Sequence, residues 1–174
     1  MPRNPEVAAL AAALAEPFEP GVIHWKPQQV KDKRCMAVAF IDARDVQDRL
    51  NTVLGAENWT DSYEVLNDGS AVCRLAVRFG EEWVTKTDVG APSDQPDAGD
   101  RLKSAFSDAL KRAAVKLGVG RYIYSLDTEW VDYDPVKKRI PNPPRLPAWA
   151  LPKDKPTGNV STPAKAPEPA KKAE

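Results

Sequence analysis

The sequence lacks a net charge, because its 25 basic and 25 acidic residues cancel. Overall charge therefore selects no class of partner, and an anion-binding surface has to arise where basic residues gather locally. Histidine is scarce too: His24 is the only one, and we interpret it as a strand residue rather than a catalytic base. A glycine-rich phosphate loop of the GxxxxGK type is also absent, so ATP is not indicated. We expect no cofactor, no metal site and no enzymatic activity.

Cysteine and long apolar runs are equally sparse. Cys35 and Cys73 each lie within an apolar run, which is typical of small core residues in a reduced protein. The apolar stretch near the N-terminus is too short for a membrane span and lacks the order of a secretory signal. We expect a soluble cytoplasmic protein without membrane contact.

The last part of the chain is rich in proline. Nine of the 17 prolines lie from Pro141 onward, where six basic residues face three acids. Proline blocks helices, and the Ala, Lys and Thr between offer little to bury. We predict one domain over residues 1–152 and a disordered Pro/Ala/Lys tail over 153–174. Leu146, Trp149 and Leu151 are the expected anchor of the tail on the core.

The patterning before Pro141 predicts an α+β fold. Helical spacing is found over residues 5–16 and 41–54, and strand-like runs cover 59–66, 71–79 and 83–89. The turn residues 67–69 predict a hairpin. We expect a short extended piece at 21–25, then a polar basic loop over 26–34. A second hairpin is expected near the C-terminus, pairing 129–133 with 137–140. Together these give a three-stranded antiparallel β-β-β-α core with flanking helices and a C-terminal hairpin.

The last helix of this core is the strongest pattern in the sequence. Apolar residues recur at steps of three and four from Leu102 to Leu117, which predicts an amphipathic helix over 100–118. Asp100 is the expected N-cap, and Gly118 provides the C-terminal stop. Alanines on the apolar stripe predict a close approach to a sheet.

The opposite face of this helix is basic. Between Asp100 and Arg121 there are six basic residues and two acids. Arg101, Lys111 and Arg112 point away from the apolar stripe, and Lys103 and Lys116 flank it and can extend over its edges. These five are candidates for binding a polyanion. A second basic cluster consists of Lys26, Lys31, Lys33 and Arg34, with Trp25 and Phe40 nearby as aromatic rings that could stack bases.

An interpretation without any ligand stays open for the same residues. A charged, solvent-exposed helix face is common on protein surfaces, and Asp108 could simply pair with Arg112 at i, i+4. Phe40 is at least as well explained as a core residue.

The order of these motifs resembles the single-strand-annealing family of repair proteins typified by eukaryotic Rad fifty-two, and its bacterial DNA-damage-response members in particular. Three stretches carry the resemblance. They are the run from Phe40 to Val46 with the following Leu-Asn, Leu-Gly and Trp, the Asp88-Val89-Gly90 triplet, and the SDALKRA run at 107–113 with its closing Leu-Gly.

The resemblance implies a protein that binds single-stranded DNA during recombination and repair. It would anneal strands or protect DNA ends without ATP, as a homo-oligomeric ring near the nucleoid. It implies that Lys111 and Arg112 grip the DNA backbone, with Phe40 and Lys26 beside them. The sequence differs from the family pattern at two places. Val115 stands where the family has an Arg, and the loop 91–100 is acidic where relatives carry lysines. Both differences weaken the expectation of annealing activity and of duplex binding.

Two other functions stay open at this stage. The chain could be an assembly module that recruits a recombinase or single-strand-binding protein through its tail. It could also be a metal-dependent nuclease that uses acids of the 88–100 segment, among them Asp94, Asp97 and Asp100, although a solvated loop explains those acids better.

Overall fold

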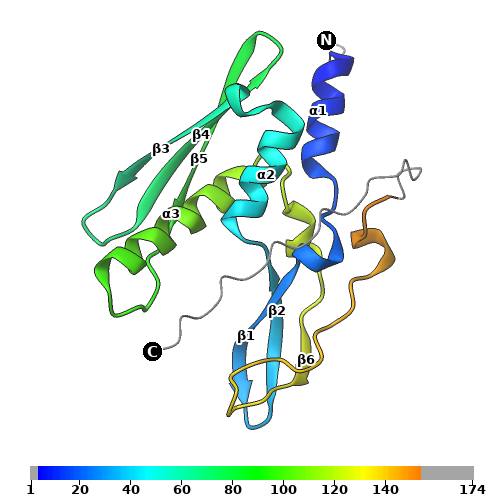
Figure 1. Cartoon of the computed structure of the whole chain (residues 1–174), viewed down its shortest axis with the longest axis vertical. Coiled ribbons are helices and arrows are strands. Elements are labelled where there is room, and N and C mark those ends of the chain that lie inside the picture. Colours follow the sequence, from blue (N-terminus) through cyan, green and yellow to red (C-terminus); the bar gives the residue numbers. More distant parts are fainter. Residues whose placement is uncertain (1–3, 154–174) are drawn as a thin grey trace, which may run out of the picture.

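The protein is described from a computed structural model, which covers residues 4–153. The predicted disordered tail lies outside the described residues except for Lys153. The helices are α1 (Pro5–Ala15), α2 (Ala43–Leu54) and α3 (Ala98–Val115). The strands are β1 (His24–Lys31), β2 (Arg34–Phe40), β3 (Trp59–Val65), β4 (Ala71–Phe79), β5 (Glu82–Gly90) and β6 (Glu129–Asp132). Two three-stranded antiparallel sheets, β1-β2-β6 and β3-β4-β5, confirm the α+β class (Figure 1).

The sheet β3-β4-β5 with α3 is the predicted β-β-β-α core, and it is confirmed. Alternate residues of β4 are fully buried in the main core, as strand geometry requires when one face is covered. Helix α3 lies along this sheet (Figure 1). A Cβ added at Gly90 would lie 2.3 Å from the Ala105 carbonyl oxygen. The backbones of α3 and β5 therefore touch, which is the close approach that the buried alanines Ala105, Ala109 and Ala113 predict.

The start of α3 differs from the expectation in one detail. Asp97 rather than Asp100 is the N-cap, and its Oδ1 accepts a hydrogen bond of 3.0 Å from the Asp100 amide. The helix thus begins one turn earlier than its apolar stripe, because a capping carboxylate was available upstream of the first apolar residue.

The predicted basic loop over 26–34 is wrong. Residues 24–40 form a β-hairpin, β1-β2, that turns at Asp32, whose φ is 55°. Polar residues and Pro27 disguise β1 in the sequence. The strand tolerates them because it is an edge strand with a register shift between Pro27 and Gln29, and edges and bulges are where a residue without a backbone donor fits.

Helices α1 and α2 pack together beside the core (Figure 1). The Arg49 guanidinium of α2 fixes the end of α1. Its Nη1 donates to the carbonyl oxygens of Leu14 at 3.3 Å and Glu16 at 2.6 Å. The same guanidinium lies 4.0 Å from the ring centroid of Phe18, so one side chain joins the two helices.

The C-terminal part of the domain departs from its expected pairing. Strand β6 joins the outer edge of β2, and the expected hairpin with 137–140 is reduced to one bridge between Asp134 and Arg139. The anchor on the core is also different. Leu146 packs against the core and Ala150 is buried, whereas Trp149 is 55% exposed.

Candidate nucleic-acid interface

A groove of about 540 Å³ separates the β1-β2 hairpin from α3. Its lining brings together residues that are far apart in the sequence. Lys26 and Phe40 come from the hairpin, and Lys111 and Arg112 come from α3. These are four of the predicted site residues, and their convergence is a result of the fold. Val115 lines the same groove, so the position where the family resemblance implies an Arg is apolar here.

The hairpin side of the groove presents an aromatic ring beside a cation. Lys26 Nζ lies 5.6 Å from the ring centroid of Phe40, within the range of a cation–π contact. Phe40 is half-buried, and its ring also meets His24 at 5.5 Å between centroids. Trp25 instead packs against the core. Of the two aromatic residues near the basic cluster, Phe40 lines the groove and Trp25 does not.

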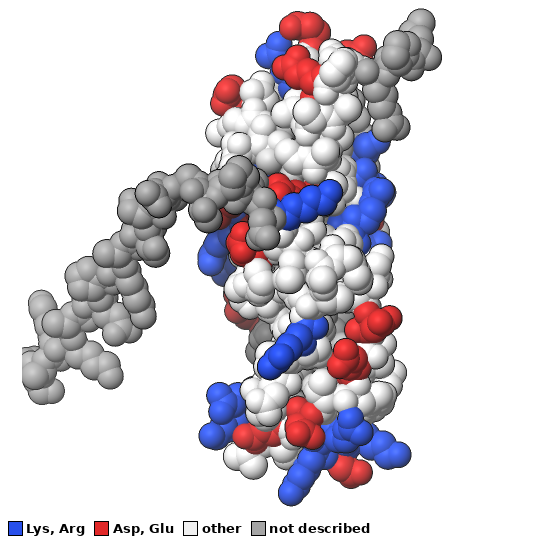
Figure 2. Space-filling view, turned by 90° about the vertical axis from the view of Figure 1, so that its right-hand side faces the viewer, with Lys and Arg blue, Asp and Glu red and all other residues white. Residues whose placement is uncertain are grey.

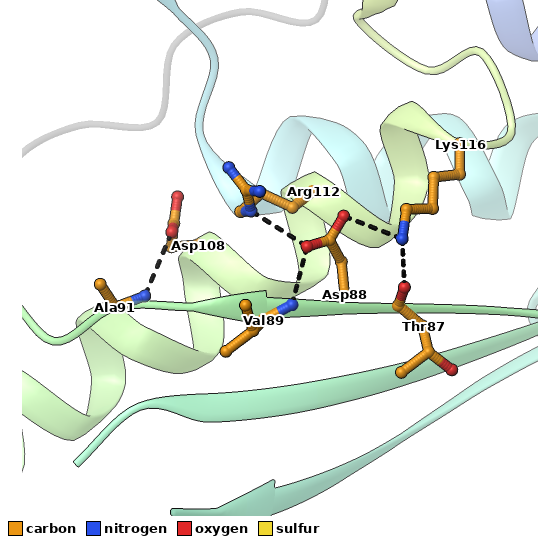
Figure 3. Close-up of polar contacts among 7 residues, drawn as sticks. All are labelled: Thr87, Asp88, Val89, Ala91, Asp108, Arg112 and Lys116. Atoms are coloured by element: carbon orange, nitrogen blue, oxygen red, sulfur yellow. Dashed lines mark hydrogen bonds and ion pairs between the residues drawn. The ribbon is translucent and has the colours of Figure 1, made fainter. Parts of the chain in front are cut away.

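On the helix side, one carboxylate organises two cations. Asp88 at the end of β5 lies between Arg112 and Lys116 (Figure 3). Its Oδ1 is 3.2 Å from Arg112 Nε, and its Oδ2 is 3.1 Å from Lys116 Nζ. Lys116 also donates to the Thr87 carbonyl oxygen. Arg112 is thus held through Nε and also lines the groove, while Lys116 is bound to β5.

The Asp88 carboxyl stays ionised through these contacts. Burial acts to raise its pKa, but the Val89 amide and the side chains of Lys116 and Arg112 donate to the carboxylate and hold the pKa below its usual 3.8. A charged Asp88 offsets part of the positive charge of α3. The alternative in which Asp108 pairs with Arg112 is not what the structure shows, because Arg112 binds Asp88 and Asp108 accepts from the Ala91 amide at 3.4 Å instead.

Lys111 is the cation of this cluster that stays unengaged. Within residues 4–153 it forms no ion pair and no hydrogen bond through its side chain. Lys111 lines the groove, and its ammonium group can bind an anion without first breaking an internal contact.

Two further predicted residues lie on α3 outside the groove. Arg101 donates to the Gln95 and Pro96 carbonyl oxygens at 3.0 and 2.8 Å, which fixes the loop before the helix. Lys103 pairs with Asp100 at 3.1 Å and is 79% exposed. Both residues are thus at the N-terminal end of α3, away from the groove lining.

Lys33 and Arg34 lie at the tip of the β1-β2 hairpin. The strand from Lys26 to Lys31 is about 16 Å long at a rise of about 3.3 Å per residue, so the tip is separate from the groove. Arg34 donates to the Trp130 carbonyl oxygen. Figure 2 shows basic and acidic side chains gathered at the lower end of the molecule, where the hairpin tip lies in Figure 1.

Tyr124 is a groove residue that the sequence analysis did not single out. It belongs to the short helix η3 (Arg121–Ser125), lines the groove and is 70% exposed. Its neighbour Tyr122 is different, because the Tyr122 hydroxyl accepts from the Phe18 amide at 3.0 Å inside the fold. The signal in the sequence was two tyrosines in a short segment after a basic helix, and only the fold separates their roles.

A larger hollow, of about 900 Å³, lies between α1 and α2. Its lining has three glutamates, Glu6, Glu16 and Glu19, against Lys153 and Arg49, and Arg49 is already bound to backbone carbonyls. The smaller groove instead has three cations, Lys26, Lys111 and Arg112, against Asp108 and Asp127. Carboxylates repel phosphate, so the smaller groove is the better candidate for a nucleic acid.

The acids considered for a nuclease do not converge. Asp97 caps α3, and Asp100 pairs with Lys103. Among residues 4–153, the group that could hold a metal ion is instead His24 with Asp42 and Asp45. There the Asp45 carboxylate accepts from the Asp42 amide at 2.9 Å in a capping box of α2, which accounts for both acids. The two cysteines are free and buried, in agreement with the expected core thiols.

The chain is similar to known proteins over most of its length. Over the described residues, no helix is long and apolar enough to cross a membrane. Residues 6–139 match the model of the Rad52/22 family of double-strand break repair proteins. The chain is 40% identical over 141 residues to the single-stranded DNA-binding protein DdrA of Deinococcus deserti, covering 80% of this chain and 68% of that one. It is 38% identical to the protein of that name from Deinococcus radiodurans, covering 80% of this chain and 66% of the relative. The match spans about two thirds of each relative, and the chain belongs to the Rad52/22 family.

Proposed function

We propose that this chain binds single-stranded DNA in the groove between the β1-β2 hairpin and α3, and acts in DNA repair. The observation that carries the proposal is the convergence of Lys26, Phe40, Lys111 and Arg112 on one groove. The names of the two relatives, both single-stranded DNA-binding proteins, support the same function.

The groove offers the two kinds of contact that single strands require. Lys111, Lys26 and the Nη groups of Arg112 bind phosphates, while Phe40 and Tyr124 present rings to the bases. Stacking on such rings contributes about 1–3 kcal/mol per base and tolerates any sequence. Sequence-independent binding of this kind suits a protein that acts wherever DNA is broken.

The proposed action needs neither ATP nor a catalytic group. Base pairing supplies the free energy of annealing, and the protein holds the strand extended and neutralises phosphate repulsion. We propose that the chain forms a homo-oligomeric ring, in which neighbouring grooves raise the effective concentration and turn weak contacts into tight binding. It would work in the cytoplasm at the nucleoid, where a recombinase or single-strand-binding protein could meet it through the tail.

End protection is the better match among the family's activities. The loop before α3 carries Asp94 and Asp97, and Val115 adds no charge to the groove. The carboxylates of this loop repel the phosphates of a duplex more strongly than those of a single strand, because duplex DNA has twice the charge per length. We therefore propose strong binding to single strands and ends, and weak binding to duplex.

The experiment is fluorescence anisotropy with a labelled single strand and the matching duplex. Replacement of Lys111 and Arg112 by Ala removes two phosphate contacts and should weaken single-strand binding to every sequence alike. Lys103→Ala is the matched control, since it removes one cation from the same helix outside the groove and should bind almost as the unmodified chain does. Equal binding by the double variant and the control at low salt would refute the groove as the site.

A further inference from the structure

The sheet β1-β2-β6 has a second surface that combines aromatic and basic side chains. In antiparallel strands, directly paired residues project from the same face. Met36 pairs with both Gln29 and Trp130, and Lys31 pairs with Arg34. Together with Phe40 and Lys26, which pair with His24 and Val38, these residues share one face of the sheet.

The burial pattern confirms which face is open. On β2, Cys35 and Ala37 are fully buried, whereas Met36 is half-buried and Arg34 is exposed. This alternation shows that the face with Met36 is turned away from the packed side. Trp130 on β6 is 42% exposed, so a large aromatic ring lies open beside the apolar Met36.

The charges on this face favour a polyanion. Lys26, Lys31 and Arg34 lie on it, and Asp132, the register partner of Arg34, is the opposing carboxylate. Arg34 also donates to the carbonyl oxygen of Trp130, which holds the guanidinium close to the tryptophan. Lys26 belongs to this face and to the groove lining alike, so the two surfaces are continuous.

We propose that this face is a second subsite for the same single strand as it leaves the groove. Trp130 stacks one nucleobase. Lys31 and Arg34, which pair with each other nearer the hairpin tip, bind the phosphates that follow it, and Lys31 lies about 16 Å along β1 from Lys26 of the groove. The ligand class is single-stranded nucleic acid, because a ring can stack only on a base whose faces are free. This inference rests on the proposed function, since the strand reaches the subsite from the groove.

The test uses the full-length chain and homothymidine oligonucleotides of increasing length in an anisotropy titration. Trp130→Ala should leave binding of the shortest oligonucleotide that occupies the groove unchanged. It should weaken binding of longer oligonucleotides by about fivefold or more, as the loss of one stacked base predicts. Trp130→Phe keeps a ring and should restore most of that loss. Trp83→Ala is the matched control, because Trp83 is 51% exposed on the other sheet.

The failure of this inference can be told apart from the failure of the proposed function. If Trp130→Ala has no effect at any length, or the same effect at every length, the second subsite is refuted while the groove stands. If Trp130→Ala changes the molecular mass of the free protein, the face contacts another copy of the chain, and the subsite is likewise refuted. Binding that is insensitive to Lys111 and Arg112 would instead refute the groove, and the subsite with it.

Discussion

The contact between Gly90 and α3 gives a prediction whose size follows from the structure. A Cβ at Gly90 would lie 2.3 Å from both the Ala105 carbonyl oxygen and the Ala109 amide nitrogen. Ordinary contacts of a Cβ begin at 3.4 Å, so in a Gly90→Ala variant α3 has to move by about 1 Å. The atoms in the way are backbone, which cannot rotate aside as a side chain would. Overpacking of this kind costs about 1–3 kcal/mol.

We expect Gly90→Ala to lower the free energy of unfolding by about 1–2 kcal/mol, after a small gain from the stiffer unfolded chain is subtracted. Urea unfolding followed by circular dichroism measures this loss, and a slope of about 2 kcal/mol per molar makes the midpoint fall by about 0.5–1 M. Gly21→Ala is the control, since a Cβ there has no neighbour within 4 Å. The reasoning is refuted if the two variants unfold at the same urea concentration.

The remaining predictions concern Asp88 and Arg49. Asp88→Asn should lower the stability at neutral pH by about 1 kcal/mol, because it removes the carboxylate that Arg112 and Lys116 share. Since the folded pKa of Asp88 lies below 3.8, this difference should persist above that pH and vanish as the pH falls through the lowered pKa; a difference that grows on acidification would contradict it. Arg49→Ala should cost about 2–4 kcal/mol in thermal unfolding, since its guanidinium binds several carbonyl oxygens at the end of α1. Arg49→Lys should recover only part of this, and full recovery would show that charge alone suffices.

The core was predictable from the sequence because its patterns are local. The steps of three and four in α3, and the turn at 67–69, specify their elements without reference to the rest of the chain. The alanines of α3 predicted a close approach to a sheet, which the structure shows at Gly90. Each of these features depends on neighbours a few residues away, which a single sequence displays directly.

The β1-β2 hairpin and β6 were not predictable in the same way. The residues of β1 are polar because one of its faces is open, and Pro27 reads as a break unless the strand is known to lie at an edge. Strand β6 pairs with β2 across about ninety residues of chain, and no local pattern specifies such a partner. The hairpin mattered most, because it carries one wall of the groove.

The candidate site was predicted in part. The family resemblance selected Lys111, Arg112, Lys26 and Phe40, and the fold places all four along one groove. The Arg112–Asp88 pair could not be foreseen, because Asp88 precedes Arg112 by 24 positions and only strand β5 brings it to the helix. Whether these residues contact DNA stays a prediction, and the outlying Lys103 and Arg101 are its natural controls.

The most direct test of the account is the salt dependence of single-strand binding by the full-length chain. Lys111, Arg112 and Lys26, with one or two cations of the hairpin, neutralise about four or five phosphates. Each released counterion contributes about 0.7 to the slope for single strands, so a plot of log K against log salt should fall with a slope of about −3. In the Lys111→Ala, Arg112→Ala double variant the slope should flatten to about −1.6. A slope near zero, or one that the double variant leaves unchanged, would contradict the claim that this groove holds the phosphates of a DNA strand.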